Sequence, residues 1–273
     1  MFLQYLSRML PIKSILLTIC AMVCALVSQA QTVTYLGNEG VLIEYQGKKV
    51  IIDALFTDPT GKFHTPDYDL MDDIIAGKSP YEGVNTALVT HTHADHFDAP
   101  SYVNYLKNNK DARVIATPQA ADSMRLKADG YDEVKDRVST NVWTKGWKTD
   151  VVDDMTISSA YTRHAGKAYG KIQNQIFLVT IADKKILHVA DTQMDVRYFD
   201  DLRLIYEEID LAIVPFWFMT NLFGTEIIEK HIAAKKVVGM HLPTSGNDKT
   251  IEKINQQMPS AEVFSEPGQK INF

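Results

Sequence analysis

The segment from His91 to His96 carries the side chains in this sequence that are best suited to chemistry. It reads His-Thr-His-Ala-Asp-His, so three of the eight histidines in the 273-residue chain and one aspartate fall within six positions. Imidazole nitrogens and carboxylate oxygens are common ligands of zinc and other transition metals. On a tight loop, His91 and His93 point the same way and can share one ion. Asp95 and His96 then turn toward a second ion, so the spacing predicts a metal site.

Three further candidates for metal binding follow predicted strands later in the chain. They are His164, Asp191 and His241. Because loops at the strand ends of an α/β layer gather on one edge of the sheet, these side chains can converge with the first cluster. Each of them alone is typical of an ordinary loop or turn residue, and the metal-site prediction therefore depends on their convergence.

The elements that must position these residues alternate between strands and helices. Hydrophobic alternation, turn residues and helix-capping residues identify them. Sheets in both halves of the chain, with helices outside them, predict one α/β domain in which two sheets pack between helical layers. Strands are predicted at 33–36, 41–45, 49–53, 87–90, 113–116, 155–162, 176–182, 185–190, 211–215, 237–240 and 262–264, and helices at 69–75, 100–108, from 118 toward 130, 196–208, 225–234 and 250–258.

Two stretches of the chain are candidates for substrate contacts. The segment from Phe56 to Glu82 is long for a simple connection, which indicates an ordered insertion or lid with a short helix inside it. The run from Phe216 to Met219 is apolar and follows a predicted strand. This run is equally consistent with core packing and with a hydrophobic wall for a substrate, since binding pockets are mostly apolar.

Two polar residues near the predicted strands have supporting roles in this interpretation. Asp53 closes a predicted strand, where it either accepts a hydrogen bond from a metal-ligating histidine or caps the strand. His188 lies within a predicted strand, and we expect a buried, hydrogen-bonded histidine there rather than a metal ligand.

The first thirty residues have the pattern of a cleavable signal peptide. Arg8 and Lys13 precede an apolar run at residues 14–27, which leads to the small residues Ser28 and Ala30. The run is shorter than the roughly 20 residues that a membrane span needs. We therefore expect cleavage after Ala30, a mature domain of residues 31–273, no lasting membrane anchor, and a periplasmic or extracellular location. Both cysteines of the chain leave with this leader.

The charge of the mature chain disfavours nucleic acid as a partner. Without Arg8 and Lys13, the 28 basic residues become 26, against 34 acidic ones, which leaves a net charge of −8. Such a surface repels phosphate backbones, although a local metal site could still bind one phosphate or carboxylate group. We expect a small-molecule substrate, and the oligomeric state stays open.

The His-x-His-x-Asp-His segment, with the later histidine, aspartate and histidine at strand ends, resembles the metallo-β-lactamase superfamily. The segment from Tyr35 to Gly40 and on to Asp53 is similar to the first motif of that family, and the resemblance covers Thr32 to the C-terminus. The resemblance implies an αββα four-layer sandwich with two divalent metal ions. It also implies the ligands: His91, His93 and His164 on one ion, Asp95, His96 and His241 on the other, and Asp191 between them.

The activity implied by the resemblance is hydrolysis by a metal-bridging hydroxide, on a small ester, lactone or phosphodiester. Asp95 is then the catalytic residue that accepts a hydrogen bond from the hydroxide and relays its proton to the leaving group. Zinc is the expected metal, with manganese or iron as alternatives at the second, oxygen-richer site.

The first motif is most similar to the branch that contains ascorbate-6-phosphate lactonase and phospholipase-D-like phosphodiesterases. In that branch a histidine commonly stands at the position of Asn38, so the substrate contacts of this chain are expected to differ. Two other functions remain open at this point. One is β-lactam hydrolysis, although the mature chain lacks the cysteine ligand of the best-known β-lactamase branch, and the other is a non-catalytic metal-binding domain of the same fold.

Overall fold

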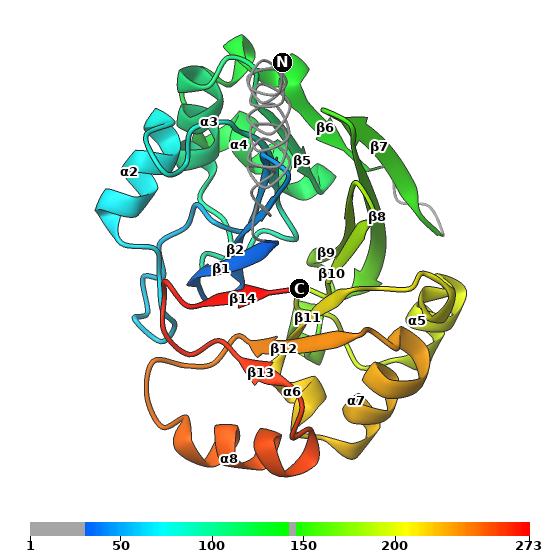
Figure 1. The fold of residues 1–273 in the computed structure, drawn as a ribbon. Coiled ribbons are helices and arrows are strands. Elements are labelled where there is room, and N and C mark those ends of the chain that lie inside the picture. Colours follow the sequence, from blue (N-terminus) through cyan, green and yellow to red (C-terminus); the bar gives the residue numbers. More distant parts are fainter. Residues whose placement is uncertain (1–30, 142–145) are drawn as a thin grey trace, which may run out of the picture. The chain divides into compact units, whose positions relative to one another are not determined.

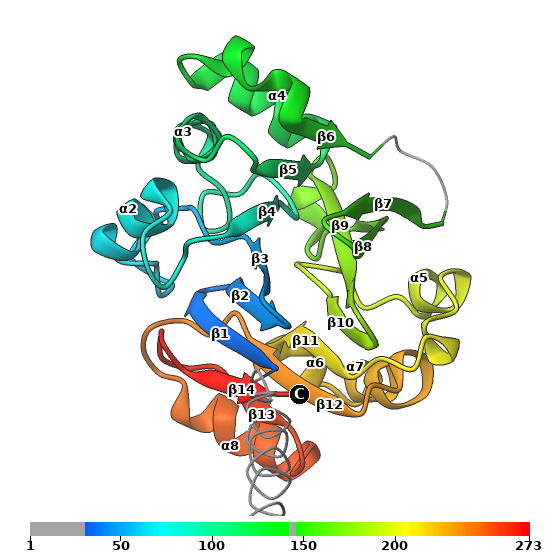
Figure 2. The same cartoon turned by 45° about the horizontal axis from the view of Figure 1, so that its top comes forward.

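Two β-sheets lie face to face in the part of the chain that the structure describes, residues 31–141 and 146–273 of a computed structural model (Figure 1). Their inner faces pack against each other through buried apolar side chains, among them Val33 and Ile43 from one sheet and Phe177 and Ile213 from the other. Helices cover the two outer faces (Figure 2), which confirms the predicted αββα sandwich. The predicted signal peptide, residues 1–30, lies outside the described residues.

The first sheet has, in spatial order, the strands β14 (Lys270–Asn272), β1 (Thr32–Gly37), β2 (Gly40–Tyr45), β3 (Lys48–Ile52), β4 (Val84–Leu88), β5 (Arg113–Ala116) and β6 (Val138–Thr140). The strands from β14 to β3 pair antiparallel, and those from β3 to β6 pair parallel. Buried side chains of three helices pack on its outer face: α2 (Tyr68–Ala76), α3 (Ala99–Asn108) and α4 (Pro118–Lys127).

The second sheet has, in spatial order, the strands β13 (Glu262–Val263), β12 (Lys236–Met240), β11 (Leu211–Pro215), β10 (Lys184–His188), β9 (Gln173–Ile181), β8 (Met155–Arg163) and β7 (Lys148–Val152). The strands from β7 to β10 pair antiparallel, and those from β10 to β13 pair parallel. Its outer face packs against α5 (Val196–Asp201), α6 (Phe216–Met219), α7 (Leu222–Ile227) and α8 (Asp248–Gln257).

Short helical turns complete the described part of the chain. Turns of 3₁₀ type lie at Tyr131–Glu133, Lys135–Arg137, Lys167–Tyr169 and Leu204–Tyr206, and a π turn lies at Ile228–Ile232. None of the helices within residues 31–141 and 146–273 combines the length and the apolar character that crossing a bilayer requires.

The helices on the first sheet begin where capping residues place them. Asp67, Asp98 and Thr117 each accept a hydrogen bond from a backbone N–H three residues further on, at the first turns of α2, α3 and α4. The N–H of Asp98 also donates to the carbonyl oxygen of Leu55 at 3.0 Å. Because Asp98 lies two residues after His96, these bonds anchor one end of the His91–His96 segment.

The predicted helix at 196–208 is wrong in its second half. α5 ends at Asp201, and Arg203 has a left-handed backbone with φ of 55°. This reversal is followed by a 3₁₀ turn, which lets Leu204 pack with Phe199 in the core outside the second sheet. The apolar spacing is therefore compatible with a helix, but the tertiary packing bends the chain.

Other boundaries also differ from the prediction. The helix predicted at 225–234 begins earlier, at Leu222, and ends in the π turn, where Ala233 has a left-handed φ of 53°. β4 ends at Leu88 rather than at residue 90, because Thr90 leaves the ladder and donates its backbone N–H to Asp53. The prediction missed the strands β6, β7 and β14 and the short helix α6.

Candidate metal centre

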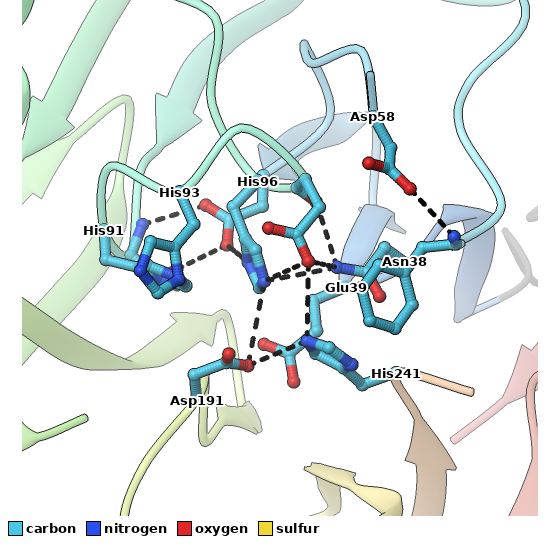
Figure 3. A network of polar contacts seen from close by, with 12 residues as sticks. Asn38, Glu39, Asp58, His91, His93, His96, Asp191 and His241 are labelled. Atoms are coloured by element: carbon cyan, nitrogen blue, oxygen red, sulfur yellow. Dashed lines mark hydrogen bonds and ion pairs between the residues drawn. The ribbon is translucent and has the colours of Figure 1, made fainter. Parts of the chain in front are cut away.

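Connections from both sheets carry the predicted metal-site residues to one place. The connection from β4 to α3 holds the segment from His91 to His96, while His164, Asp191 and His241 follow β8, β10 and β12. The turn between β1 and β2 faces the same place (Figure 3). The structure thus brings together all seven residues that the sequence singled out: His91, His93, Asp95, His96, His164, Asp191 and His241.

The first group of converging side chains is rich in histidine. His93 Nδ1 lies 3.1 Å from His91 Nε2 and 3.2 Å from His164 Nε2, and Asp191 Oδ2 lies 3.3 Å from His164 Nε2. Four ligands at about 2.05 Å around a tetrahedral zinc ion lie roughly 3.3 Å from one another. The spacing of these nitrogen and oxygen atoms therefore fits a single small cation.

The second group contains Asp95, His96 and His241. His241 Nε2 lies 3.2 Å from Asp191 Oδ1 and 3.8 Å from Asp95 Oδ2. His96 Nε2 lies 3.7 Å from Asp191 Oδ1 and 3.8 Å from Asp95 Oδ2. Asp191 thus turns one oxygen toward each group, which is the arrangement expected of a carboxylate between two ions.

Buried polar atoms without hydrogen-bond partners test whether the centre suits cations. Among the described residues, Asp191 Oδ1 and both ring nitrogens of His241 are buried and lack such a partner. Leaving a buried polar group unsatisfied costs about 1–3 kcal/mol, and more when the group is charged. Cations among these atoms would remove that cost, so the donor set fits a pair of divalent metal ions.

Hydrogen bonds behind the converging atoms orient the imidazole rings. Asp53 Oδ2 lies 2.8 Å from His96 Nδ1, and Asp53 also accepts hydrogen bonds from the backbone N–H and the hydroxyl of Thr90. His91 Nδ1 is 2.9 Å from the Thr90 hydroxyl, and His164 Nδ1 is 2.6 Å from the carbonyl oxygen of Ala165. Partners of this kind fix which ring nitrogen faces a metal. The predicted role of Asp53 as an acceptor for a site histidine is confirmed.

The electrostatics of the centre separate neutral from protonated histidines. Burial, reinforced by neighbouring imidazoles, lowers the pKa of His91 well below its usual value and that of His93 to about 4. Burial also acts to lower the pKa of His96, but the negative charge of Asp191 and the hydrogen bond to Asp53 outweigh it and raise that pKa to about 10. The carboxylates of Asp191 and Asp53, which keep His96 protonated, would attract a metal cation in the same way.

The comparisons with known proteins agree with this geometry. A family model described as a β-lactamase superfamily domain matches residues 48–252, well over half of the chain. The chain belongs to the metallo-β-lactamase superfamily. One relative is a metal-dependent hydrolase of Chelativorans sp., which is 24% identical over 254 residues that cover 88% of this chain and 99% of the relative.

Two solved structures of bacterial proteins share this fold. A possible metal-dependent hydrolase of Veillonella parvula has a TM-score of 0.62 and 15% identity, over 89% of this chain and all of that one. The metallo-β-lactamase fold protein YhfI of Bacillus subtilis has a TM-score of 0.61 and 14% identity, over 89% of this chain and 98% of that one. At these identities the likeness concerns the fold.

Asn38 contacts the centre of this superfamily member directly. Its side-chain N–H₂ group donates to the carbonyl oxygen of Asp95 at 3.0 Å and to Asp95 Oδ2 at 3.2 Å, and it lies 3.2 Å from His96 Nε2. Asn38 has a left-handed φ of 42°, a conformation that asparagine tolerates better than most residues. Asn38 therefore positions the Asp95 carboxylate.

Glu39 is a residue at this centre that the sequence interpretation missed. Its side chain is fully buried, and burial together with the charge of Asp191 raises its pKa well above the usual range. The available signal was a charged residue in the turn Gly-Asn-Glu-Gly, which joins two apolar strands. His188, by contrast, is a buried histidine that bonds to the Glu39 carbonyl oxygen at 3.0 Å, as predicted.

A cavity of about 520 Å³ opens over the two groups of ligand atoms. One wall comes from the 56–82 insertion, in which the ring of Phe63 packs edge-on against that of His241 with 4.6 Å between the ring centroids. Trp217 lies on another side of the cavity, with its ring centroid 5.1 Å from that of His241. The ring centroid of Tyr169 lies 4.8 Å from that of His93. Within the apolar run of α6, Trp217 lines the cavity and Phe218 is buried in the core, so core packing is confirmed for part of the run and the substrate wall stays a prediction.

Proposed function

We propose that this chain is a dinuclear metal-dependent hydrolase of a small ester, lactone or phosphodiester. The observation that carries the proposal is the Asp191 carboxylate, which is buried with one oxygen toward His164 and the other toward His241. Its Oδ1 atom has no hydrogen-bond partner among the described residues, and a cation on each side would explain both orientations.

The proposed chemistry divides between the ions and the side chains of the chain. When bound, divalent cations lower the pKa of a coordinated water toward 7 and polarise the substrate oxygen that develops negative charge. His91, His93 and His164 would hold one ion, and Asp95, His96 and His241 the other, with Asp191 between them. We expect zinc at the histidine-rich group and zinc, manganese or iron at the second group.

Asp95 is the side chain placed to move a proton during hydrolysis. It lines the cavity, and the hydrogen bond from Asn38 holds its Oδ2 atom in one orientation. From this position Asp95 accepts the proton of the attacking water and hands it to the leaving-group oxygen.

The cavity supports a small substrate with an apolar portion. Its volume suits a small molecule, and Phe63, Trp217 and Tyr169 supply apolar surface beside the ligand atoms. Lys62 stands at the rim, where it can pair with an anionic group. The predicted signal peptide and the acidic mature chain complete the proposal of an exported enzyme, periplasmic or extracellular, that acts on small molecules rather than on nucleic acid.

The test combines metal analysis with a substrate panel. The purified protein is expected to contain two ions per chain and to hydrolyse at least one chromogenic ester, lactone or bis-phosphodiester, with loss of turnover after chelation. Nitrocefin in the same panel detects β-lactam hydrolysis. His93→Ala and Asp191→Ala should each lower turnover by more than about 100-fold together with metal content, since losing even an outer partner of a ligand costs 10–100-fold.

The matched control for this test is His231→Ala. His231 pairs with Asp200 at 2.6 Å on the outer helical layer, away from the cavity, so its loss should change neither the metal content nor the turnover. Bound metal without turnover on any substrate of the panel would contradict the hydrolase proposal.

A further inference from the structure

Glu39 presents to the second group of ligand atoms a carboxyl group that no hydrogen bond in the described part of the chain satisfies. Its side chain is 0% exposed, and neither Oε1 nor Oε2 has a hydrogen-bond partner among the described residues. In Figure 3 the carboxylate lies next to that of Asp191. One Glu39 oxygen, one Asp191 oxygen and one His96 nitrogen all lie within 4.8 Å of one another.

These distances are close to those around a single ion. Two donors on opposite sides of an octahedral ion, at 2.1–2.2 Å each, lie roughly 4.2–4.4 Å apart. A separation of at most 4.8 Å therefore closes with a shift of a few tenths of an ångström, which a glutamate side chain accommodates by small torsion changes. The position of Glu39 is within reach of the ion that His96 would bind.

The backbone holds Glu39 at this place. The Glu39 carbonyl oxygen bonds to His188 Nε2 at 3.0 Å, and the backbone N–H of His241 donates to the Asn38 carbonyl oxygen at 3.3 Å. A Cβ atom at Gly37 would lie 2.8 Å from backbone of the insertion, and one at Gly40 would lie 2.7 Å from the Asp53 carbonyl oxygen. The turn is thus clamped between the two sheets and cannot carry the side chain out to solvent.

A purely structural role does not explain this carboxylate. A buried polar group without a partner destabilises the fold, and an apolar residue of similar size would avoid that cost. A bound cation would satisfy both oxygens of such a group, because carboxylate oxygens are among the ligands that divalent metals prefer.

We propose that Glu39 is an additional ligand of the second ion, beside Asp95, His96, His241 and Asp191. This inference rests on the proposed metal-dependent function. With Glu39 the second site has three carboxylates and two imidazoles, more donors than tetrahedral zinc takes. The second site therefore favours a six-coordinate ion such as Mn²⁺ over Zn²⁺, relative to the same site without Glu39.

The experiment measures metal binding to wild type and Glu39→Gln without reference to turnover. Each protein is stripped with chelator and titrated with Mn²⁺ and with Zn²⁺ by calorimetry and by competition with a metal indicator. The amide keeps the size of the side chain and removes its charge. We expect the first ion to bind equally well and the second to bind at least about 10-fold more weakly in Glu39→Gln, with the larger loss for Mn²⁺.

A stability measurement separates this role from a structural one. Because the stripped wild type buries an unpaired carboxylate, stripped Glu39→Gln should unfold at the same or a higher temperature. Metal-loaded Glu39→Gln should unfold at a lower temperature than loaded wild type. Glu39→Asp, which keeps the charge on a shorter side chain, should bind the second ion with intermediate affinity.

The matched control is Glu44→Gln, on the neighbouring strand β2. Glu44 is part-exposed and pairs with Lys49 at 3.7 Å, so its loss should leave both metal affinities unchanged. Second-ion affinity in Glu39→Gln equal to that of wild type would overturn the inference and leave the proposed function standing. Wild type that binds no ion would overturn the proposed function, and this inference with it.

Discussion

Asp53 controls the orientation of His96, and a single substitution tests that dependence. The carboxylate contacts His96 Nδ1 and the Thr90 backbone N–H at 2.8 Å each. When His96 Nε2 faces a metal, its Nδ1–H must donate to residue 53. In Asp53→Asn an N–H₂ group replaces one of the two acceptor oxygens, so His96 or the Thr90 N–H loses its acceptor. We expect second-ion affinity to fall by about 10–100-fold, measured by metal titration, because outer hydrogen-bond partners of metal ligands typically contribute that much.

The control for this substitution matches its backbone conformation. Asp53 has a left-handed φ of 44°, which asparagine also tolerates, so the variant should fold. Asp153→Asn changes another aspartate with a left-handed φ of 50°, in the exposed turn between β7 and β8, and should leave metal binding unchanged. Equal second-ion affinity in Asp53→Asn and wild type would show that His96 does not need this acceptor.

At the same scale, the sequence predicted the residues whose identity depends on local spacing. His91, His93 and His96 stand within six positions, so a single loop brings them together and the pattern is visible without a structure. The turn that holds Glu39 was visible in the sequence, but its place at the centre was not, because its neighbours there are His96 and Asp191, far away in the sequence. Its burial arises only when the second sheet covers the turn.

At the scale of the elements, Asp58 organises the part of the insertion that walls the cavity. Its carboxylate accepts hydrogen bonds from the backbone N–H groups of Thr60, Lys62 and Phe63, at 2.7–2.9 Å. Burial acts to raise the pKa of Asp58, but these bonds outweigh it and lower the pKa below its usual value. The ionised carboxylate thus holds Phe63 against His241.

The sign of that pKa shift predicts how the loop responds to acid. The folded pKa lies below the unfolded value of about 3.9, so the stabilisation is fully present above pH of about 4 and is lost as the pH falls through the folded pKa. We expect the amides of residues 60–63 to stay protected from hydrogen exchange at pH 5 and to lose protection progressively as the pH is lowered below about 4, after correction for intrinsic rates.

A substitution tests at neutral pH whether the Asp58 carboxylate orders residues 60–63. Asp58→Ala removes the acceptor, so these amides should exchange faster and KM should rise with little change in kcat. Asp122→Asn, which changes an exposed residue of α4 paired with Arg125, is the control. Unchanged protection of residues 60–63 in Asp58→Ala would mean that other contacts order the insertion.

The elements themselves were predicted well where the signals are local. A proline near its start identified α3 and the cap at Thr117 identified α4, and the apolar strands of both sheets were found within a few residues of their bounds. The break at Arg203 was missed because the apolar spacing on its two sides also fits a continuous helix. The edge strands β6 and β14 were missed because they pair with strands from which other elements separate them in the sequence, while β7 forms a hairpin with β8 and alternates polar and apolar residues too weakly to be found.

At the scale of the whole molecule, the centre lies where the two sheets meet, and each sheet supplies ligand atoms. His91, His93, Asp95 and His96 come from the first sheet, and His164, Asp191 and His241 from the second. Bound ions would therefore cross-link the two halves of the fold, and binding to the folded state alone raises its stability by mass action.

Removing metal should accordingly lower the temperature of unfolding. An ion present at 100 times its Kd contributes about 2.7 kcal/mol, which corresponds to roughly 5–10 °C for a domain of this size. Calorimetry of the protein with and without EDTA measures the difference, and His93→Ala should show a smaller one. A wild-type transition that EDTA does not move would argue against ions that join the sheets.

The short strand β14 has a consequence for how the chain behaves at high concentration. It pairs with β1 from Thr32 to Thr34, along the side of β1 that β2 leaves free. Without it, β1, in which Val33 and Tyr35 alternate with threonines, would offer its free amide and carbonyl groups to any neighbouring molecule. β14 itself has only three residues, and its Lys270 is charged and exposed, so it is a poor edge for another chain to pair with. By covering β1, it lowers the tendency of the protein to aggregate through strand pairing.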